Sequence, residues 1–337
     1  MADTTAEGVD NNPITVDDTV SELDSTFSEA GSDTTSLTSS VLKYRFEHGR
    51  RYHGYRDGRY LLPNDEKEQD RMDILSFLFT LALDGELFLA PIEKHPQRIL
   101  DLGCGTGQWA IDIGDMFPSA QVIGNDLSPI QPSMVPPNVQ FEVDDIESDW
   151  AFRTPFDFIH GRYLASAVRD WPRLFQQTYQ NLKPGGYCEF LDFDFTYRSD
   201  DGSIKETHDL YINSAEFIRA ANILGQEPCP GPKFRKWAEE TGFVNIKEHT
   251  FKIPNGPWPK DSKLKELGAW NRIQSLEGFE AWTMGMFTRV LGWSPEEVQV
   301  HLARARQDIR NPDIHAYVLL YVVYAQKPKE KGKANDE

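Results

Sequence analysis

Positively charged residues are scarce in this sequence. Its 337 residues include 35 Lys and Arg against 53 Asp and Glu, which gives a net charge of −18 at pH 7. Half of that charge comes from residues 1–40, which hold nine acidic residues and no Lys or Arg. Because nucleic-acid binding depends on clustered Lys and Arg that contact phosphates, we expect no nucleic-acid partner.

Cysteines and long apolar runs are also few. The three cysteines, Cys104, Cys188 and Cys229, lie far apart and lack the spacing of a metal site. They indicate free thiols in a reducing compartment, and we expect no bound metal. No run of about eighteen apolar residues predicts a membrane span, and the acidic first residues are unlike a secretory leader. We therefore expect a soluble, cytoplasmic protein with no membrane partner.

Composition divides the chain into four parts. Residues 1–42 are rich in Thr, Ser and Asp, which predicts a disordered acidic tail. Such a tail is either a recruitment peptide for protein partners or a solvated leader, and the second interpretation is favoured. Residues 43–95 form an aromatic segment with a helix, 96–327 form one α/β domain, and 328–337 form a polar tail.

A glycine-rich motif begins the α/β domain. Residues 99–102 are mostly apolar, which is typical of a buried parallel strand. Gly103, Gly105 and Gly107 follow, and glycine lets the backbone turn sharply and lie against a ligand. The apolar residues between Gln108 and Phe117 then suit a helix packed on a sheet. A strand, a glycine turn and a helix together predict a nucleotide-binding βαβ unit.

Two acidic residues indicate which nucleotide the loop binds. In the dinucleotide fingerprint the third glycine comes three residues after the second, whereas here it comes two after. Asp101, two residues before the first glycine, would repel a pyrophosphate but suits an ammonium group. Asp126 ends the next predicted strand, 23 residues after Gly103, at the right distance for ribose hydroxyls. These features point to S-adenosylmethionine as the cofactor.

The segment from Asp101 to Gly107 resembles motif I of the class I methyltransferases. A second resemblance, to the LaeA-like methyltransferases of fungi, extends from about Tyr44 to Lys327. It rests on the tyrosine-rich lead-in 52–60, the helix start Leu62-Pro63-Asn64-Asp65 and the acidic tail. The implied fold is α/β, with a Rossmann-like seven-stranded sheet in the order 3-2-1-4-5-7-6. The last strand is expected to be antiparallel.

Helical additions are expected at two places. Asp65 can cap a helix that runs to about Leu89, with Glu68 completing a capping box. A helical lid insertion is expected at about 254–312, which is too long for a hairpin loop. It holds four of the eight tryptophans, and we expect it to shape an apolar pocket over the cofactor. The alternative is that these helices only pack on the flank of the sheet.

The resemblance also implies residue roles. Asp145 would accept a hydrogen bond from the adenine amine, and Ile146 would contact the adenine ring. Tyrosines of the lead-in would either cover the cofactor or pack the segment against the sheet. The cofactor-binding candidates are Asp101, Gly103, Gly105, Gly107, Asp126, Leu127, Asp145, Ile146 and Tyr60. The substrate-pocket candidates are Arg162, Tyr55 and Trp282.

The expected reaction is methyl transfer, for which a base is needed only if the acceptor holds a proton. His160, near the end of the fourth strand, is the first candidate for that base because histidine titrates near neutral pH. The alternatives are Glu189, Asp192 and His208. The sequence lacks the Asn-Pro-Pro-Tyr loop of many nucleic-acid methyltransferases, which disfavours base methylation.

Three functional hypotheses remain open at the level of sequence. The first is a methyltransferase for a small molecule or modified peptide, in fungal secondary metabolism. The second is a LaeA-like nuclear regulator that acts through protein partners by way of its acidic tail. The third is a cofactor-binding scaffold that has lost catalysis.

Overall fold

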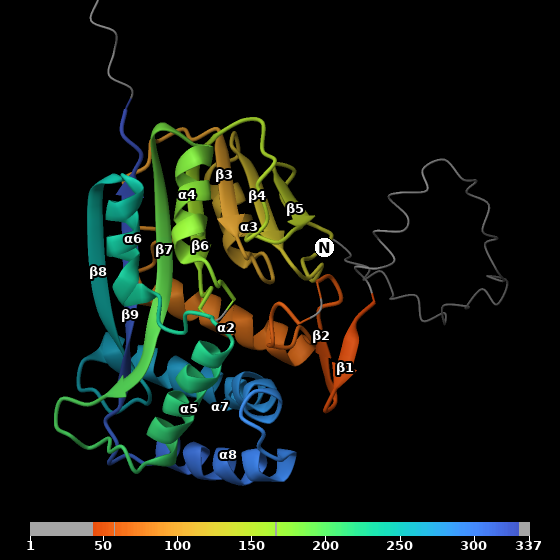
Figure 1. The fold of residues 1–337 in the computed structure, drawn as a ribbon. Coiled ribbons are helices and arrows are strands. Elements are labelled where there is room, and N and C mark those ends of the chain that lie inside the picture. Colours follow the sequence, from red (N-terminus) through yellow and green to blue (C-terminus); the bar gives the residue numbers. More distant parts are fainter. Residues whose placement is uncertain (1–42, 57, 166, 330–337) are drawn as a thin grey trace, which may run out of the picture. The chain divides into compact units, whose positions relative to one another are not determined.

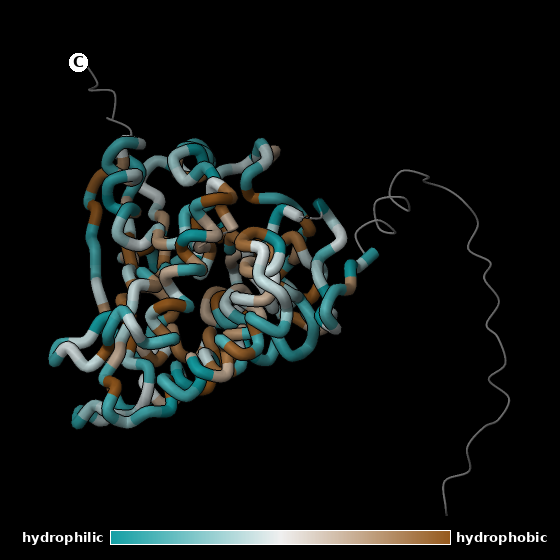
Figure 2. Tube along the Cα trace, turned by 60° about the horizontal axis from the view of Figure 1, so that its bottom comes forward, coloured by the Kyte–Doolittle hydropathy of each residue, from teal (hydrophilic) through white to brown (hydrophobic). Residues whose placement is uncertain are grey.

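The structure, a computed structural model, describes residues 43–56, 58–165 and 167–329. The predicted acidic tail, 1–42, and residues 330–337 of the predicted polar tail lie outside the described residues. In Figure 2 the apolar stretches run mostly through the interior, and the outer turns are largely hydrophilic. Within the described ranges, no helix combines the length and the apolar character that crossing a bilayer would require.

Seven strands form one sheet in the order β5-β4-β3-β6-β7-β9-β8 (Figure 1). Strands β5, β4, β3, β6 and β7 are parallel to one another, whereas β9 is antiparallel to both β7 and β8. This confirms the predicted order and the antiparallel last strand. The strands are β3 (Arg98–Leu102), β4 (Gln121–Asp126), β5 (Val139–Val143), β6 (Phe156–Arg162), β7 (Leu182–Arg198), β8 (Val244–Pro254) and β9 (Tyr317–Gln326).

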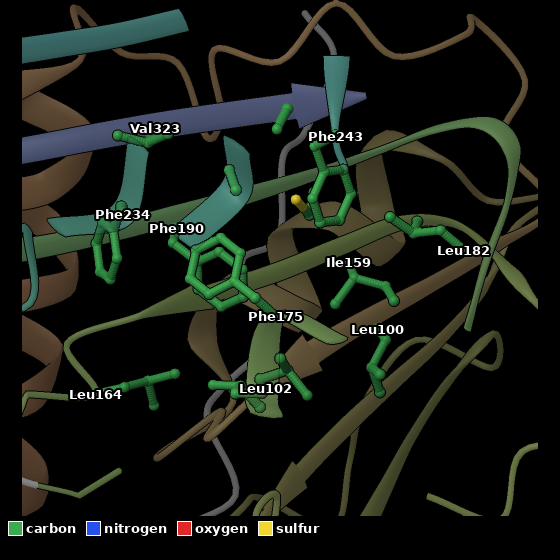
Figure 3. Close-up of a cluster of buried hydrophobic side chains, with 14 of the residues drawn as sticks. Leu100, Leu102, Ile159, Leu164, Phe175, Leu182, Phe190, Phe234, Phe243 and Val323 are labelled. Atoms are coloured by element: carbon green, nitrogen blue, oxygen red, sulfur yellow. The ribbon is translucent and has the colours of Figure 1, made fainter. Parts of the chain in front are cut away.

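Helices cover both faces of the sheet because its central strands are apolar on both sides. On one face lie α4 (Trp171–Asn181) and α6 (Phe234–Thr241), which follows the short 3-10 helix η1 (Gly231–Lys233). Figure 3 shows Phe175 of α4, Phe190 of β7 and Phe234 of α6 packed together on this face. The other face is covered by α3 (Gln108–Met116) and α2 (Glu66–Ala82).

Helix α2 is preceded by a hairpin of β1 (Arg45–Glu47) and β2 (Arg50–Tyr52) and begins where predicted. Its cap Asp65 accepts a hydrogen bond from the Glu68 amide, 3.1 Å away. The Glu68 carboxylate, in contrast, bonds to Arg71 instead of returning to the cap. The predicted end at Leu89 is wrong. The helix stops at Ala82 because Asp84 and Gly85 take positive φ angles of 59° and 93°.

The predicted insertion contains two long helices, α7 (Ser262–Arg289) and α8 (Pro295–Arg310). They pack with α5 (Asp209–Ile223) around Phe279, Phe287 and Leu302, beyond the lower end of the sheet in Figure 1. Helix α7 also packs against α2, where Trp270 contacts the ring of Phe77 edge-on at 5.2 Å. The insertion therefore builds a second core beside the sheet.

Candidate functional site

A cleft of about 1190 Å³, part of it open to solvent, lies at the carboxyl ends of β3, β4 and β6. One wall is the segment 59–64, and helix α2 forms another through Glu68, Met72 and Ser76. In an open parallel sheet, this edge is where ligands bind. The cleft brings together most of the predicted site residues, namely Tyr60, Asp101, Gly103, Gly105, Asp126, Leu127, Asp145, Ile146 and Arg162.

The glycine loop forms the floor of this cleft. Gly103 and Gly105 line it with φ angles of 62° and 56°, a backbone conformation that other residues adopt at a cost. Gly107 does not line the cleft. It begins α3 with a φ of 83°, and a Cβ atom there would lie 2.4 Å from the Phe141 ring. Gly107 is therefore required for packing between the loop and β5.

Asp126 holds the glycine loop from the end of β4. Its Oδ2 accepts from the Gly105 amide at 2.9 Å, and its Oδ1 accepts from the Ser128 amide at 2.8 Å. Burial raises the pKa of Asp126 to about 6, although both amide bonds favour the carboxylate. Each carboxylate oxygen can accept a further hydrogen bond, so the residue can also hold ribose hydroxyls.

His160 lies beneath the cleft, not in it. Its imidazole is fully buried and stacked on Trp109, with ring centroids 3.7 Å apart. Its Nδ1 lies 3.0 Å from Oδ1 of Asp101, and burial lowers the pKa of His160 despite that carboxylate. A ring sealed between a strand and a helix is not positioned to take a proton from a substrate. The geometry therefore does not favour the predicted base, and His160 positions Asp101 instead.

The lead-in segment contacts the far end of the cleft through two arginines. Asp145, 4 % exposed, lies 2.8 Å from Nη1 of Arg56 and 3.3 Å from Nη2 of Arg59. The Arg59 guanidinium also lies 3.4 Å from Glu147. These ion pairs attach the segment to the loop after β5. Tyr60 lines the cleft, whereas Tyr55 lies outside it.

A second cavity of about 520 Å³, part of it open to solvent, adjoins the cleft and is called the chamber here. Leu62 and Tyr163 line both spaces and form the boundary between them. Trp282 is the only one of the four insertion tryptophans that lines either space within the described residues. The remaining lining residues come from the ends of β6 and β7 and from α5 and α7: Ala165, Phe195, Tyr197, Asn213, Ser214, Phe217 and Phe279.

Sequence reasoning missed a buried ion pair between the cleft and the chamber. Arg71 donates to Glu68 at 2.6 and 3.0 Å and to Gln274 of α7 at 3.1 Å. Its guanidinium carbon lies 5.5 Å from the Tyr163 ring centroid and 5.3 Å from that of Trp282. Tyr163 has a φ of 57°, unusual for an aromatic residue. The spacing of Glu68 and Arg71 on a helix was visible in the sequence, but their burial was not.

The cleft fits S-adenosylmethionine by its chemistry. A sulfonium donor that carries an ammonium group and a ribose needs carboxylates and a backbone with no side chain in the way. Asp101, Asp126 and the glycines supply these. Among the residues that the structure describes, no group of His, Cys, Asp and Glu could hold a metal ion.

The sheet order, the glycine loop and the acids at the ends of β3 and β4 define the class I methyltransferase architecture. Residues 74–248 match the family described as "Methyltransferase domain", and the chain belongs to this family. It is a methyltransferase with S-adenosylmethionine as its methyl donor, as the glycine loop and its two acids predict.

Curated relatives cover nearly the whole chain. Methyltransferase pytC of Aspergillus terreus is 47% identical over 91% of this chain and 95% of its own length. Secondary metabolism regulator LAE1 of Cochliobolus heterostrophus is 37% identical over 84% of this chain and 95% of its own. These relatives confirm the predicted resemblance to LaeA-like proteins.

Solved structures resemble the chain more distantly. A phosphoethanolamine N-methyltransferase of Haemonchus contortus with bound S-adenosyl-L-methionine has a TM-score of 0.46 and 17% identity. The similarity covers 88% of this chain and 74% of the solved chain.

Proposed function

We propose that this methyltransferase acts on an apolar small molecule or a modified peptide side group that enters the chamber. The relative pytC is named a methyltransferase and LAE1 a secondary metabolism regulator, so we place the reaction in fungal secondary metabolism. The proposal rests on one observation. A mostly apolar chamber of about 520 Å³ adjoins the cofactor cleft and shares Leu62 and Tyr163 with it.

The residues of the chain bind and align the two reactants. When bound, the donor supplies an electrophilic methyl group. Asp101 and Asp126 would hold the donor's charged and ribose groups in the cleft, and its methyl group would meet the acceptor beside Leu62 and Tyr163, which line both spaces. The aromatic walls of the chamber exclude water and restrict the acceptor's orientation, and alignment of this kind contributes several kcal/mol.

Polar groups in the chamber are mostly occupied by the protein itself. Ser214 Oγ donates to the Phe195 carbonyl, and Asn213 Oδ1 accepts from Thr283 at 3.2 Å. The Tyr197 hydroxyl accepts from Asn255 at 2.9 Å. An acceptor is therefore recognised mainly by apolar contact and shape, with the polar groups limiting its orientation.

A pair of variants on α5 tests the chamber. Ser214→Phe fills it, whereas Ile223→Phe places the same aromatic side chain at an exposed position of the same helix. Methyl transfer is measured with labelled S-adenosylmethionine and candidate acceptors from a fungal extract. We expect Ser214→Phe to lose at least about tenfold in transfer while S-adenosylhomocysteine binding in calorimetry changes less than about twofold. Ile223→Phe should alter neither quantity. Normal transfer by Ser214→Phe would refute the chamber as the acceptor site.

The alternative is a regulatory protein that acts through partners, favoured by the similarity to LAE1. Its predicted contact element, the acidic tail at 1–42, lies outside the described residues. Deletion of residues 1–42 separates the two functions. A small-molecule methyltransferase keeps its turnover without the tail, whereas a regulator loses partner capture and nuclear localisation.

A further inference from the structure

We propose that Arg162 binds the α-carboxylate of the methyl donor, so that Asp101 and Arg162 together recognise an amino-acid zwitterion. This changes the sequence-based interpretation, which placed Arg162 in the substrate pocket. It rests on donor binding in the cleft and is independent of which acceptor enters the chamber.

The sheet register places the two side chains on the same face. Asp101 of β3 lies opposite His160 of β6, and the hydrogen bond between them shows that both point to the same side. Side chains alternate along a strand, so Arg162, two residues after His160, points to that side as well. Both Asp101 and Arg162 line the cleft, next to Gly103. The Asp101 charge also raises the pKa of Arg162 against the larger opposing effect of burial.

In the described part of the chain, Arg162 forms no ion pair with a carboxylate, although the charges of Asp101 and Asp112 raise its pKa against burial. Its Nη2 donates to the hydroxyl of Ser76 on α2 at 2.8 Å, and its guanidinium carbon lies 5.5 Å from the Phe79 ring centroid. The other arginines around the cleft differ, since Arg59 pairs with Asp145 and Arg71 with Glu68. Burial lowers the pKa of Arg162, which means that the charged form is poorly solvated here. A partly buried guanidinium of this kind gains most from an anionic ligand.

The carboxylate of Asp101 has one oxygen left for the opposite charge. Its Oδ1 takes the bond with Nδ1 of His160, whereas Oδ2 accepts no hydrogen bond from the residues described here. An ammonium group can therefore bind at Oδ2 while the carboxylate of the same amino acid binds at Arg162. Two opposite charges at fixed positions orient the amino-acid end of the donor. Ser76 and Phe79 hold the guanidinium in place before the ligand arrives.

Three ligands that differ at the amino-acid end test this assignment in calorimetry with the full chain. S-adenosylhomocysteine has both charges, its decarboxylated analogue has only the amine, and 5′-methylthioadenosine has neither. We expect the wild-type protein to bind S-adenosylhomocysteine at least about tenfold more tightly than the decarboxylated analogue. Arg162→Met should abolish this preference and leave affinity for 5′-methylthioadenosine within about twofold. Arg162→Lys keeps the positive charge but loses the planar guanidinium that can bind a carboxylate through two hydrogen bonds. It should retain part of the preference for S-adenosylhomocysteine.

The matched control is Arg169→Met, an exposed arginine seven residues further along that does not line the cleft. It should behave as the wild type with all three ligands. Equal affinity of the wild type for the two amine-bearing ligands would overturn the proposal without any variant, so a misfolded Arg162→Met does not remove the test. An Arg162→Met protein that weakens all three ligands alike would also overturn it, because the residue would then only shape the cleft.

The outcomes also separate this inference from the proposed function. A wild type that binds none of the ligands would refute the donor site and this inference with it. If Ser214→Phe transfers methyl groups normally while Arg162→Met abolishes the preference, only the chamber proposal fails.

Discussion

Arg71→Met should destabilise the protein by about 3–5 kcal/mol at pH 7, because it leaves the buried carboxylate of Glu68 without its counter-ion. The side chains of Arg71 and Glu68 are 1% and 3% exposed, and two hydrogen bonds of 2.6 and 3.0 Å join them. Arg71 also bonds to Gln274, so the change weakens the contact between α2 and α7. Burial lowers the pKa of Arg71, but Glu68 and its other neighbours raise it above its usual value, so the residue is charged. Glu68→Gln should cost a similar amount, because it leaves this buried charge without its counter-ion.

The double variant Glu68→Leu/Arg71→Met gives the sharper result. It removes both charges and leaves an apolar surface, so it should be less destabilising than either single change. The coupling free energy should therefore exceed about 2 kcal/mol.

Urea unfolding followed by far-UV circular dichroism measures these free energies for the four proteins at pH 7. Lys67→Met/Asp70→Leu, an ordinary charge-removing pair on the same helix, serves as the control and should change stability by less than about 1 kcal/mol. If the single changes each cost less than about 1 kcal/mol, or if the double variant equals their sum, the pair does not hold α2 as inferred.

Predictions at three further positions, Asp126, Glu189 and Gly107, can be measured as well. Burial raises the pKa of Asp126 to about 6, so the affinity for S-adenosylhomocysteine should fall as the pH drops below 6. At pH 7, Asp126→Ala should weaken the binding of S-adenosylhomocysteine, and Cys104→Ala should not. Burial raises the pKa of Glu189 to about 8, so the wild type should lose stability as pH rises from about 4 toward 8. In Glu189→Gln the loss of stability between pH 5 and pH 8, measured from unfolding curves, should become smaller without vanishing, because burial raises the pKa of Asp126 too. Gly107→Ala should lower the melting temperature in calorimetry because its Cβ would lie 2.4 Å from Phe141, and Phe141→Leu should restore part of the loss.

Local patterns in the chain were sufficient for most of the sheet. The strand predicted at 99–102 proved to be β3, and the strand predicted to end at Asp126 proved to be β4. His160 lies near the end of β6, as predicted for the fourth strand. The helix predicted to run to Leu89 ends at Ala82. The prediction ran too far because the apolar spacing continues past the turn at Asp84-Gly85. That pair was a recognisable turn signal that the apolar residues after it obscured.

Contacts between distant segments decided the environment of each candidate group. In the sequence, His160 is a polar residue near the end of an apolar strand, which does not show whether its ring is exposed. The packing of α3 on the sheet places Trp109 on that ring and buries it. Glu68 fitted a capping box, but Arg71 competes for its carboxylate once α7 has buried both. Charge and burial of such groups depend on neighbours that local spacing does not specify.

By itself, the sequence determined the donor side of this protein. The glycine loop, Asp101 and Asp126 belong to consecutive strands and turns, whose local conformation brings them to one edge. The sequence predicted an apolar pocket shaped by the insertion, with Trp282 in it, but only the tertiary structure decided which residues line the chamber that we propose for the acceptor. The chamber draws Leu62, Tyr163, Ser214 and Trp282 from segments far apart in the chain. A cavity between such segments is a property of their packing, because apolar residues that line it have the same spacing as those that fill a core.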